Sequence, residues 1–109
     1  MKKEFQIIAE LIKNNTRVLD VGCGDGILMK HLKDNKNVDT RGLEISKNNV
    51  QICISKGLPV IEGNAERDLQ QFPDLSFDYV VLSQTLQAFY NPEKVIDDLL
   101  KVANKAIVT

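Results

Sequence analysis

Val18-Leu19-Asp20-Val21-Gly22-Cys23-Gly24-Asp25-Gly26 is the most informative run in this chain of 109 residues. Residues 16–21 predict a short buried strand, and three glycines within five residues follow it. Because glycine accepts positive φ angles and carries no side chain, such a turn lets the backbone approach a ligand closely. Leu28, Met29 and Leu32 then indicate a helix. The sequence therefore predicts a strand, a ligand-binding loop and a helix, in that order.

Strands and helices alternate along the rest of the chain. Further strands are predicted at residues 40–45, 58–62, 77–83 and 105–109. A first helix is expected where apolar residues recur at helical spacing: Phe5, Ile7, Ile8, Ala9, Leu11 and Ile12. This alternation predicts an α/β fold, a Rossmann-like, doubly wound parallel sheet with helices on both faces. Its ligand crevice should lie at the carboxyl ends of the strands.

Two later helices have recognisable start signals. Ser46 can cap a helix that ends at Gly57, and Asn91-Pro92 can start another, because proline needs no amide donor at the first helical position. The buried face of the earlier helix is predicted to contain Val50, Cys53 and Ile54. That of the later helix is predicted to contain Val95, Ile96, Leu99, Leu100 and Ala103.

The composition indicates one ordinary globular domain rather than a disordered or fibrous chain. Fourteen Lys and Arg nearly balance fifteen Asp and Glu, so the net charge of -1 gives no general attraction to nucleic acid or to an anionic membrane. Cys23 and Cys53 form neither a disulfide framework nor a metal-ligand cluster in the sequence. No signal peptide or membrane-spanning run is apparent, and we expect a cytoplasmic protein.

The spacing and charge of the glycine loop indicate which ligand it binds. A dinucleotide loop would read Gly-x-Gly-x-x-Gly, whereas this chain has Gly-x-Gly-x-Gly and places Ile27 where the third glycine would stand. Asp20 and Asp25 flank the loop, and their carboxylates would repel a pyrophosphate. They suit a cation. S-adenosylmethionine carries an ammonium and a sulfonium group, so the loop favours this ligand over a dinucleotide.

Polar residues at later strand ends are further candidates. Glu44 lies 18 residues beyond Gly26, where a carboxylate can accept both ribose hydroxyls of an adenosine or can be a solvated strand-end acid. Asn64 can pair with an adenine edge or can be an ordinary turn asparagine. His31, the only histidine, is interpreted as a surface or packing residue. Cys23 is expected to be exposed by its loop, but it has no base or metal partner and is not assigned a catalytic role.

The run 18–26 resembles motif I of class I S-adenosylmethionine-dependent methyltransferases. Leu43-Glu44, Gly63-Asn64-Ala65 and Phe77-Asp78-Tyr79-Val80 are similar to the later motifs in the same order. More narrowly, the chain from about Thr16 to Thr109 resembles the MetW family of methionine-biosynthesis proteins. The segments that carry this narrower resemblance are 49–50, 53–54, 82–88, 91–92 and 106–108.

The resemblance implies S-adenosylmethionine as cofactor and a role in methionine biosynthesis in association with a homoserine O-acyltransferase, without a defined methyl acceptor. The implied cofactor-binding residues are Asp20, Gly22, Cys23, Gly24, Gly26, Glu44, Ile45, Asn64, Ala65 and Ser83. Asn64 stands where an aspartate is common. The family continues beyond Thr109, so residues 1–109 are expected to be a single domain that lacks the distal strands and the acceptor site they help to build.

Three hypotheses about function follow. In a methyltransferase, the sulfonium is an activated leaving group and the protein mainly positions donor and acceptor, with Ser83 and Gln84 bordering the methyl group. Alternatively, the same pocket serves a non-catalytic regulatory protein that binds the acyltransferase. A nucleotide-dependent dehydrogenase is disfavoured by the loop. The apolar last strand, Ala106-Ile107-Val108, is expected to mediate self-association or partner binding as an unpaired edge.

Overall fold

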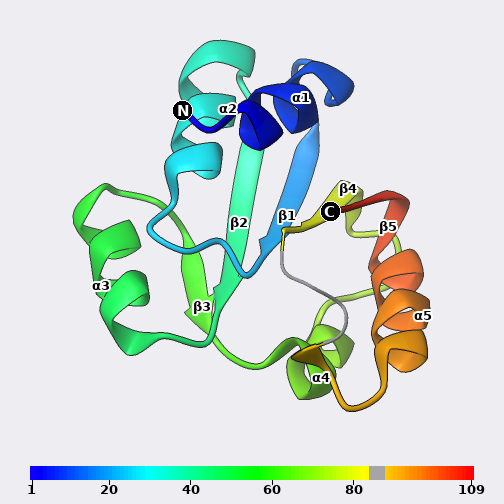
Figure 1. Ribbon diagram of the computed structural model, residues 1–109. Helices are drawn as coiled ribbons and strands as arrows, with labels where there is room; N and C mark the ends of the chain where they lie inside the picture. The colour runs from blue at the N-terminus through cyan, green and yellow to red at the C-terminus, as the bar shows by residue number, and fades with distance from the viewer. Residues whose placement is uncertain (84–87) are drawn as a thin grey trace.

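The computed structural model describes residues 1–83 and 88–109, and these form a parallel sheet of five strands in the order β3-β2-β1-β4-β5 (Figure 1). The strands are β1 (Arg17–Val21), β2 (Asp39–Glu44), β3 (Val60–Glu62), β4 (Phe77–Leu82) and β5 (Ala103–Val108). The helices are α1 (Lys3–Leu11), α2 (Ile27–Lys36), α3 (Lys47–Ser55), α4 (Ala65–Asp68) and α5 (Pro92–Val102), with a 3-10 helix, η1, at Leu69–Gln71. The predicted doubly wound α/β fold is confirmed.

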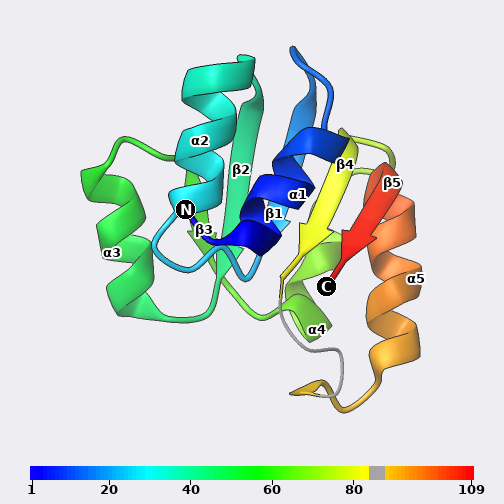
Figure 2. The ribbon, with the colours of Figure 1, turned by 45° about the horizontal axis from the view of Figure 1, so that its top comes forward.

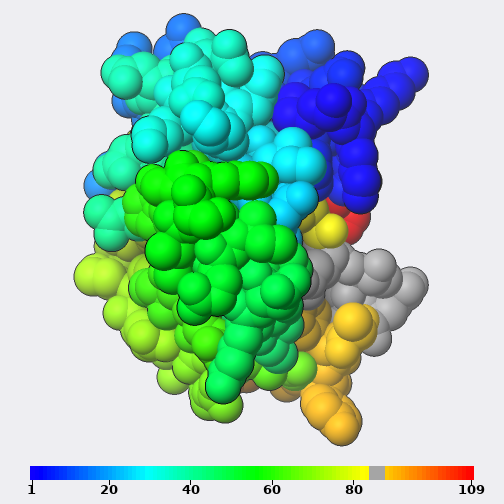
Figure 3. Space-filling model, turned by 90° about the vertical axis from the view of Figure 1, so that its left-hand side faces the viewer, coloured from blue at the N-terminus to red at the C-terminus, as the bar shows by residue number. Residues whose placement is uncertain are grey.

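Helices cover both faces of the sheet, as Figure 2 shows. On one face, α1 and α2 pack on alternate residues of the central strands, such as Val18 and Val81. On the other face, α4, η1 and α5 pack on Leu19 and Val80, the residues next to Val18 and Val81 along the same strands. This division follows from the period of two in a strand, since successive side chains point to opposite faces. Viewed from the β3 side, α3 covers much of the surface (Figure 3).

Several residues predicted to be buried are in fact exposed. Ile54 on α3 and Leu100 on α5 lie more than half exposed, and so do Ile7 and Leu11 on α1. Each helix contacts the sheet along a narrower stripe than the apolar pattern suggested, so residues at the margin of the stripe remain in solvent. Ala103 is buried as predicted but belongs to β5, because α5 ends at Val102.

The predicted helix starts at Ser46 and Asn91 are confirmed. The Ser46 hydroxyl accepts a hydrogen bond from the Asn49 N–H, and the Asn91 side-chain carbonyl accepts one from the Lys94 N–H. Both bonds satisfy a backbone donor in the first turn that has no partner within its helix. The described helices all fall short of the length and apolar character that crossing a membrane requires.

The sheet brings the predicted site residues to one edge. All strand pairs are parallel, and Val21 at the end of β1 pairs with Leu43 on β2 and with Leu82 on β4. Glu44 pairs in turn with Glu62 at the end of β3. The helix after β1 covers one face and the helix after β4 covers the other. The carboxyl edge between β1 and β4 is therefore the switch point at which sheets of this type bind ligands.

Candidate cofactor-binding site

The three glycines of the loop have different roles. Gly22, Gly24 and Gly26 all have positive φ angles, of 73°, 59° and 87°. A Cβ added at Gly24 would meet no atom within 4 Å, so the backbone there borders open space. At Gly26 it would lie 2.5 Å from a methyl group of Leu58 and 3.0 Å from the Cys53 sulfur. Gly24 is thus the position open to a ligand, whereas Gly26 permits close packing against α3 and the turn after it.

Glu44 is buried and is held by two backbone groups. Its Oε1 accepts a hydrogen bond from the Gly24 N–H at 2.8 Å, and its Oε2 accepts one from the Ser46 N–H at 2.9 Å. Only 4% of the residue is exposed, which excludes the alternative of a solvated strand-end acid. Because each carboxylate oxygen has two lone pairs, both oxygens can still accept a ribose hydroxyl.

Asp20 is the most strongly perturbed acid of the site. It is 1% exposed, and its Oδ1 has no hydrogen-bond partner among the residues that the structure describes. Burial, and then the negative charge of Glu44, raise the pKa of Asp20 to about 7. A buried carboxyl group without a partner is costly, and groups perturbed in this way gather at functional sites. A bound cation would supply the missing partner.

Asp25 contributes less to the charge of the site than the sequence suggested. Its Oδ1 accepts a hydrogen bond of 3.4 Å from the Ile27 N–H at the start of α2. The ammonium group of Lys56 donates to the Asp25 carbonyl oxygen at 2.8 Å and brings a positive charge beside this acid. The preference for a cationic ligand therefore rests on Asp20 and Glu44.

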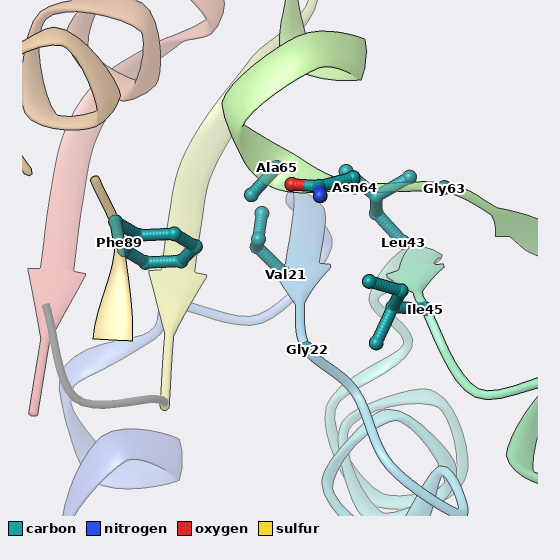
Figure 4. Close-up of a pocket in the computed structure, with 8 residues that line it drawn as sticks. All are labelled: Val21, Gly22, Leu43, Ile45, Gly63, Asn64, Ala65 and Phe89. Carbon is teal, nitrogen blue, oxygen red and sulfur yellow. The ribbon is translucent and has the colours of Figure 1, made fainter. Parts of the chain in front are cut away.

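A pocket opens beside the glycine loop at the ends of β1, β2 and β3 (Figure 4). It is lined by Val21, Gly22, Leu43, Ile45, Gly63, Asn64, Ala65 and Phe89. Ile45 is 61% exposed although it is apolar, and Phe89 lies on the opposite wall. A pocket with apolar side chains on both walls suits a flat heteroaromatic ring such as adenine.

Asn64 caps a helix and also lines the pocket. Its side-chain carbonyl accepts a hydrogen bond from the Glu66 N–H at 2.9 Å and caps α4, and its backbone N–H donates to Asp68 at 2.7 Å. It also lines the pocket, where Figure 4 shows its side-chain amide. The carbonyl oxygen accepts the bond of the cap, and the NH₂ group is the part that can donate to an adenine ring nitrogen.

Cys23 does not present its side chain to the pocket. The thiol is buried rather than exposed, 4.0 Å from the sulfur of Cys53, and burial raises its pKa. It fits there because Gly42 leaves room, since a Cβ at that position would lie 2.8 Å from the Cys23 sulfur. A buried thiol with a raised pKa is a poor nucleophile, so the side chain of Cys23 has no evident role in chemistry at the pocket.

The structure thus brings most of the predicted residues together. Gly22, Ile45, Asn64 and Ala65 line the pocket, and Asp20, Gly24 and Glu44 adjoin it at the loop. Ser83 follows the end of β4, whereas Gln84 lies outside the described residues. Within residues 1–83 and 88–109, no group of three or more His, Cys, Asp and Glu side chains could hold a metal ion.

Four residues that line the pocket were not predicted as site residues: Val21, Leu43, Gly63 and Phe89. The first three stand within the sequence motifs, whereas Phe89 stands outside them. Phe89 reaches the pocket beside Tyr90 and Asn91, whose backbone N–H groups donate to Glu66 of α4. The signal in the sequence is weak: the aromatic pair Phe89-Tyr90 stands shortly before the helix start at Asn91 and after a strand that ends at the ligand edge.

Three comparisons place the chain among known proteins. The model of the family "Methionine biosynthesis protein MetW" matches residues 2–109. The bifunctional methionine biosynthesis protein MetXA/MetW of Rhodopirellula baltica is 32% identical over 110 residues, which cover 94% of this chain and 18% of that protein.

Solved structures show the same fold. The cyclase SpnF superimposes with a TM-score of 0.80 at 23% identity, over 93% of this chain and 40% of that one. A SAM-dependent methyltransferase from Archaeoglobus fulgidus superimposes with a TM-score of 0.79 at 22% identity, over 92% of this chain and 45% of that one. The chain spans less than half of the length of each of these three proteins. Because the family match extends over almost every residue, the chain belongs to the family of the methionine biosynthesis protein MetW.

Proposed function

We propose that this chain binds S-adenosylmethionine at the carboxyl edge of the sheet. The adenine would lie in the pocket lined by Ile45 and Phe89, and the ribose hydroxyls would donate to Glu44. The ammonium group of the amino-acid end would lie toward Asp20. The observation that carries the proposal is the buried Oδ1 of Asp20, which has no hydrogen-bond partner within residues 1–83 and 88–109 and lies beside an open glycine loop. A ligand that carries positive charge next to an adenosine matches both features.

Titration calorimetry tests this assignment. S-adenosylmethionine and S-adenosylhomocysteine should both bind, and NADH should bind much more weakly, because its pyrophosphate would meet Asp20 and Glu44. If NADH bound more tightly than either adenosyl ligand, the assignment from charge and glycine spacing would be wrong.

For the reaction, we propose methyl transfer in which the protein acts mainly by positioning. The bound sulfonium supplies an activated methyl group, so no general base is strictly required of the chain. The MetW family and the methyltransferase fold support this proposal. The fold alone does not fix the reaction, since the cyclase SpnF shares it. Mass-spectrometric detection of a methylated product is the direct test.

A non-catalytic regulatory role, as partner of a homoserine O-acyltransferase, is the second candidate. This role is favoured by the Rhodopirellula relative, in which MetXA and MetW share one polypeptide. MetX is a homoserine acyltransferase. A pull-down with the acyltransferase, with and without S-adenosylmethionine, tests this role. Ligand-dependent binding without any methylated product would favour the regulatory role over methyl transfer.

We further propose that the chain can associate with a second copy through β5. This strand is an outer strand of the described sheet and has six residues, whereas β3 at the opposite edge has three. A long outer strand carries unpaired backbone donors and acceptors that can pair with another strand.

A further inference from the structure

Glu66 ties α4 to the segment that leads into α5. Its Oε2 accepts hydrogen bonds from the backbone N–H groups of Tyr90 at 3.0 Å and of Asn91 at 3.3 Å. The Lys94 ammonium adds a contact of 3.4 Å to the Glu66 carbonyl oxygen. Hydrogen bonds to an ionised acceptor are stronger than neutral ones. The first turn of α4 therefore fixes the backbone directly after Phe89.

Phe89 depends on this connection because its neighbours in sequence have little side-chain contact with the protein. Ala88 is exposed and Tyr90 is 99% exposed, so neither side chain anchors the segment. Phe89 itself is half-buried against the core that includes Val21 and Ala65. Figure 4 shows its ring pointing toward Val21 across the pocket. Among the described residues, the bonds from the Tyr90 and Asn91 N–H groups to Glu66 are thus the polar restraint on the backbone next to this ring.

We propose that Glu66 is a positioning residue for the adenosyl pocket. It does not line the pocket; it holds Phe89 in place against the wall formed by Val21 and Ala65. The inference rests on the proposed adenosyl function and extends it, because it assigns part of the ligand affinity to a residue that the ligand does not touch. Glu66 also follows Asn64 and Ala65 at the start of α4. This one helical turn therefore supplies one wall of the pocket, through Asn64 and Ala65, and restrains the wall that contains Phe89, through Glu66.

Calorimetry with S-adenosylhomocysteine on three variants of the whole chain tests the proposal. Glu66→Ala should weaken binding about tenfold, since coupled neighbouring groups commonly interact at this level. Glu66→Gln keeps a carbonyl oxygen that can accept both N–H groups and should recover most of the affinity. Glu93→Ala is the matched control: it removes an exposed acid in the first turn of α5 and should change binding less than twofold.

A double-mutant cycle separates positioning from a general structural effect. If Glu66 acts through Phe89, Glu66→Ala should have little further effect on affinity in a Phe89→Ala background. Equal losses in both backgrounds would overturn the proposal, because Glu66 would then act on the ligand by another route.

Hydrogen exchange of the ligand-free protein provides a reading that does not depend on binding. The amide protons of Tyr90 and Asn91 should exchange faster in Glu66→Ala than in the wild type and in Glu93→Ala. Unchanged exchange would show that Glu66 does not restrain the segment, and the inference would fail while adenosyl binding stood. Faster exchange together with no adenosyl binding by the wild type would instead refute the proposed function, and with it the role of Glu66 in affinity.

Discussion

Glu44 Oε1 lies 2.8 Å from the backbone nitrogen of Gly24, and this hydrogen bond joins the end of β2 to the middle of the glycine loop. The other carboxylate oxygen holds the N–H of Ser46 at the start of α3. One buried side chain therefore fixes two loops at the ligand edge. A site fixed before the ligand arrives loses less conformational entropy on binding.

The variant Glu44→Ala should bind S-adenosylhomocysteine at least about tenfold more weakly. It would lose charge-assisted hydrogen bonds to the ribose, which are worth roughly 1.5–3 kcal/mol, and it would also release Gly24. Calorimetry measures the affinity. Glu62→Ala is the matched control, because Glu62 is an exposed acid at the end of the adjacent strand.

The domain should remain folded in Glu44→Ala, as circular dichroism would show, because the carboxylate is not part of the apolar core. An unchanged dissociation constant would remove Glu44 from the ligand site and leave it only the role of holding the loops.

Ligand affinity should depend on pH through Asp20. In the free protein, the pKa of about 7 leaves this carboxyl group neutral below pH 7. A cation bound beside it favours the ionised form and lowers that pKa, so binding releases a proton. The affinity for S-adenosylmethionine should therefore rise between pH 5.5 and 7, by up to about tenfold per pH unit. Calorimetry across this range measures the slope.

Two controls identify the source of this pH dependence. Asp20→Asn should weaken binding and remove the slope, and methylthioadenosine, which lacks the amino-acid end and its charges, should show no slope with the wild type. A slope that persisted in Asp20→Asn would assign the proton to another group.

Asp20 should also reduce the stability of the free domain above pH 7. Its pKa is 3.8 when unperturbed and about 7 in the fold, so between these values the folded state binds more protons than the unfolded state. The stability contributed by this group therefore falls as the pH rises from 4 to 7. The difference corresponds to roughly 4 kcal/mol above pH 7.

Asp20→Asn, which cannot ionise, should thus be more stable than the wild type at pH 8, by roughly 2–4 kcal/mol in urea unfolding, with a smaller advantage toward pH 4. A gain in stability together with a loss of binding is the pattern expected where a site residue is costly to the fold. Equal stability of the two proteins at pH 8 would contradict the burial-induced pKa.

The sequence predicted the sheet and the glycine loop because their signals are local. Strand periodicity, the glycines at 22, 24 and 26, and the capping residues Ser46 and Asn91 each act within a few residues of the chain. Residues 65–71 were not assigned a helix, since a helix of one turn is too short to show a period. Asn64, which caps this helix, could be interpreted from the sequence only as a turn residue or as a residue that binds the ligand.

Contacts between distant segments could not be predicted from one sequence. The burial of Cys23 depends on the absence of a side chain at Gly42, 19 positions away and on the adjacent strand. Phe89 enters the pocket because Glu66, 23 positions earlier, binds the chain beside it. Neither contact produces a pattern among neighbouring residues of the sequence. Each forms only when the sheet brings the carboxyl ends of its strands together.

The outer strand β5 gives the last prediction, that the wild-type chain forms dimers in solution. The Thr109 N–H donates to the Leu82 carbonyl oxygen at 3.0 Å, so this amide faces β4. Since successive amides of a strand alternate in direction, the N–H of Val108 faces away from β4. It has no partner among the described residues, and a strand of a second copy could accept its hydrogen bond. Its side chain is also partly exposed.

Val108→Pro removes this outward donor and leaves the bond from Thr109 to Leu82 in place, so the variant should be monomeric with an unchanged circular dichroism spectrum. Val108→Ala keeps the N–H and is the matched control, which should still form dimers. Light scattering over a range of concentrations measures both. If the wild type stayed monomeric throughout, or if the proline variant still formed dimers, β5 would not be the contact between copies.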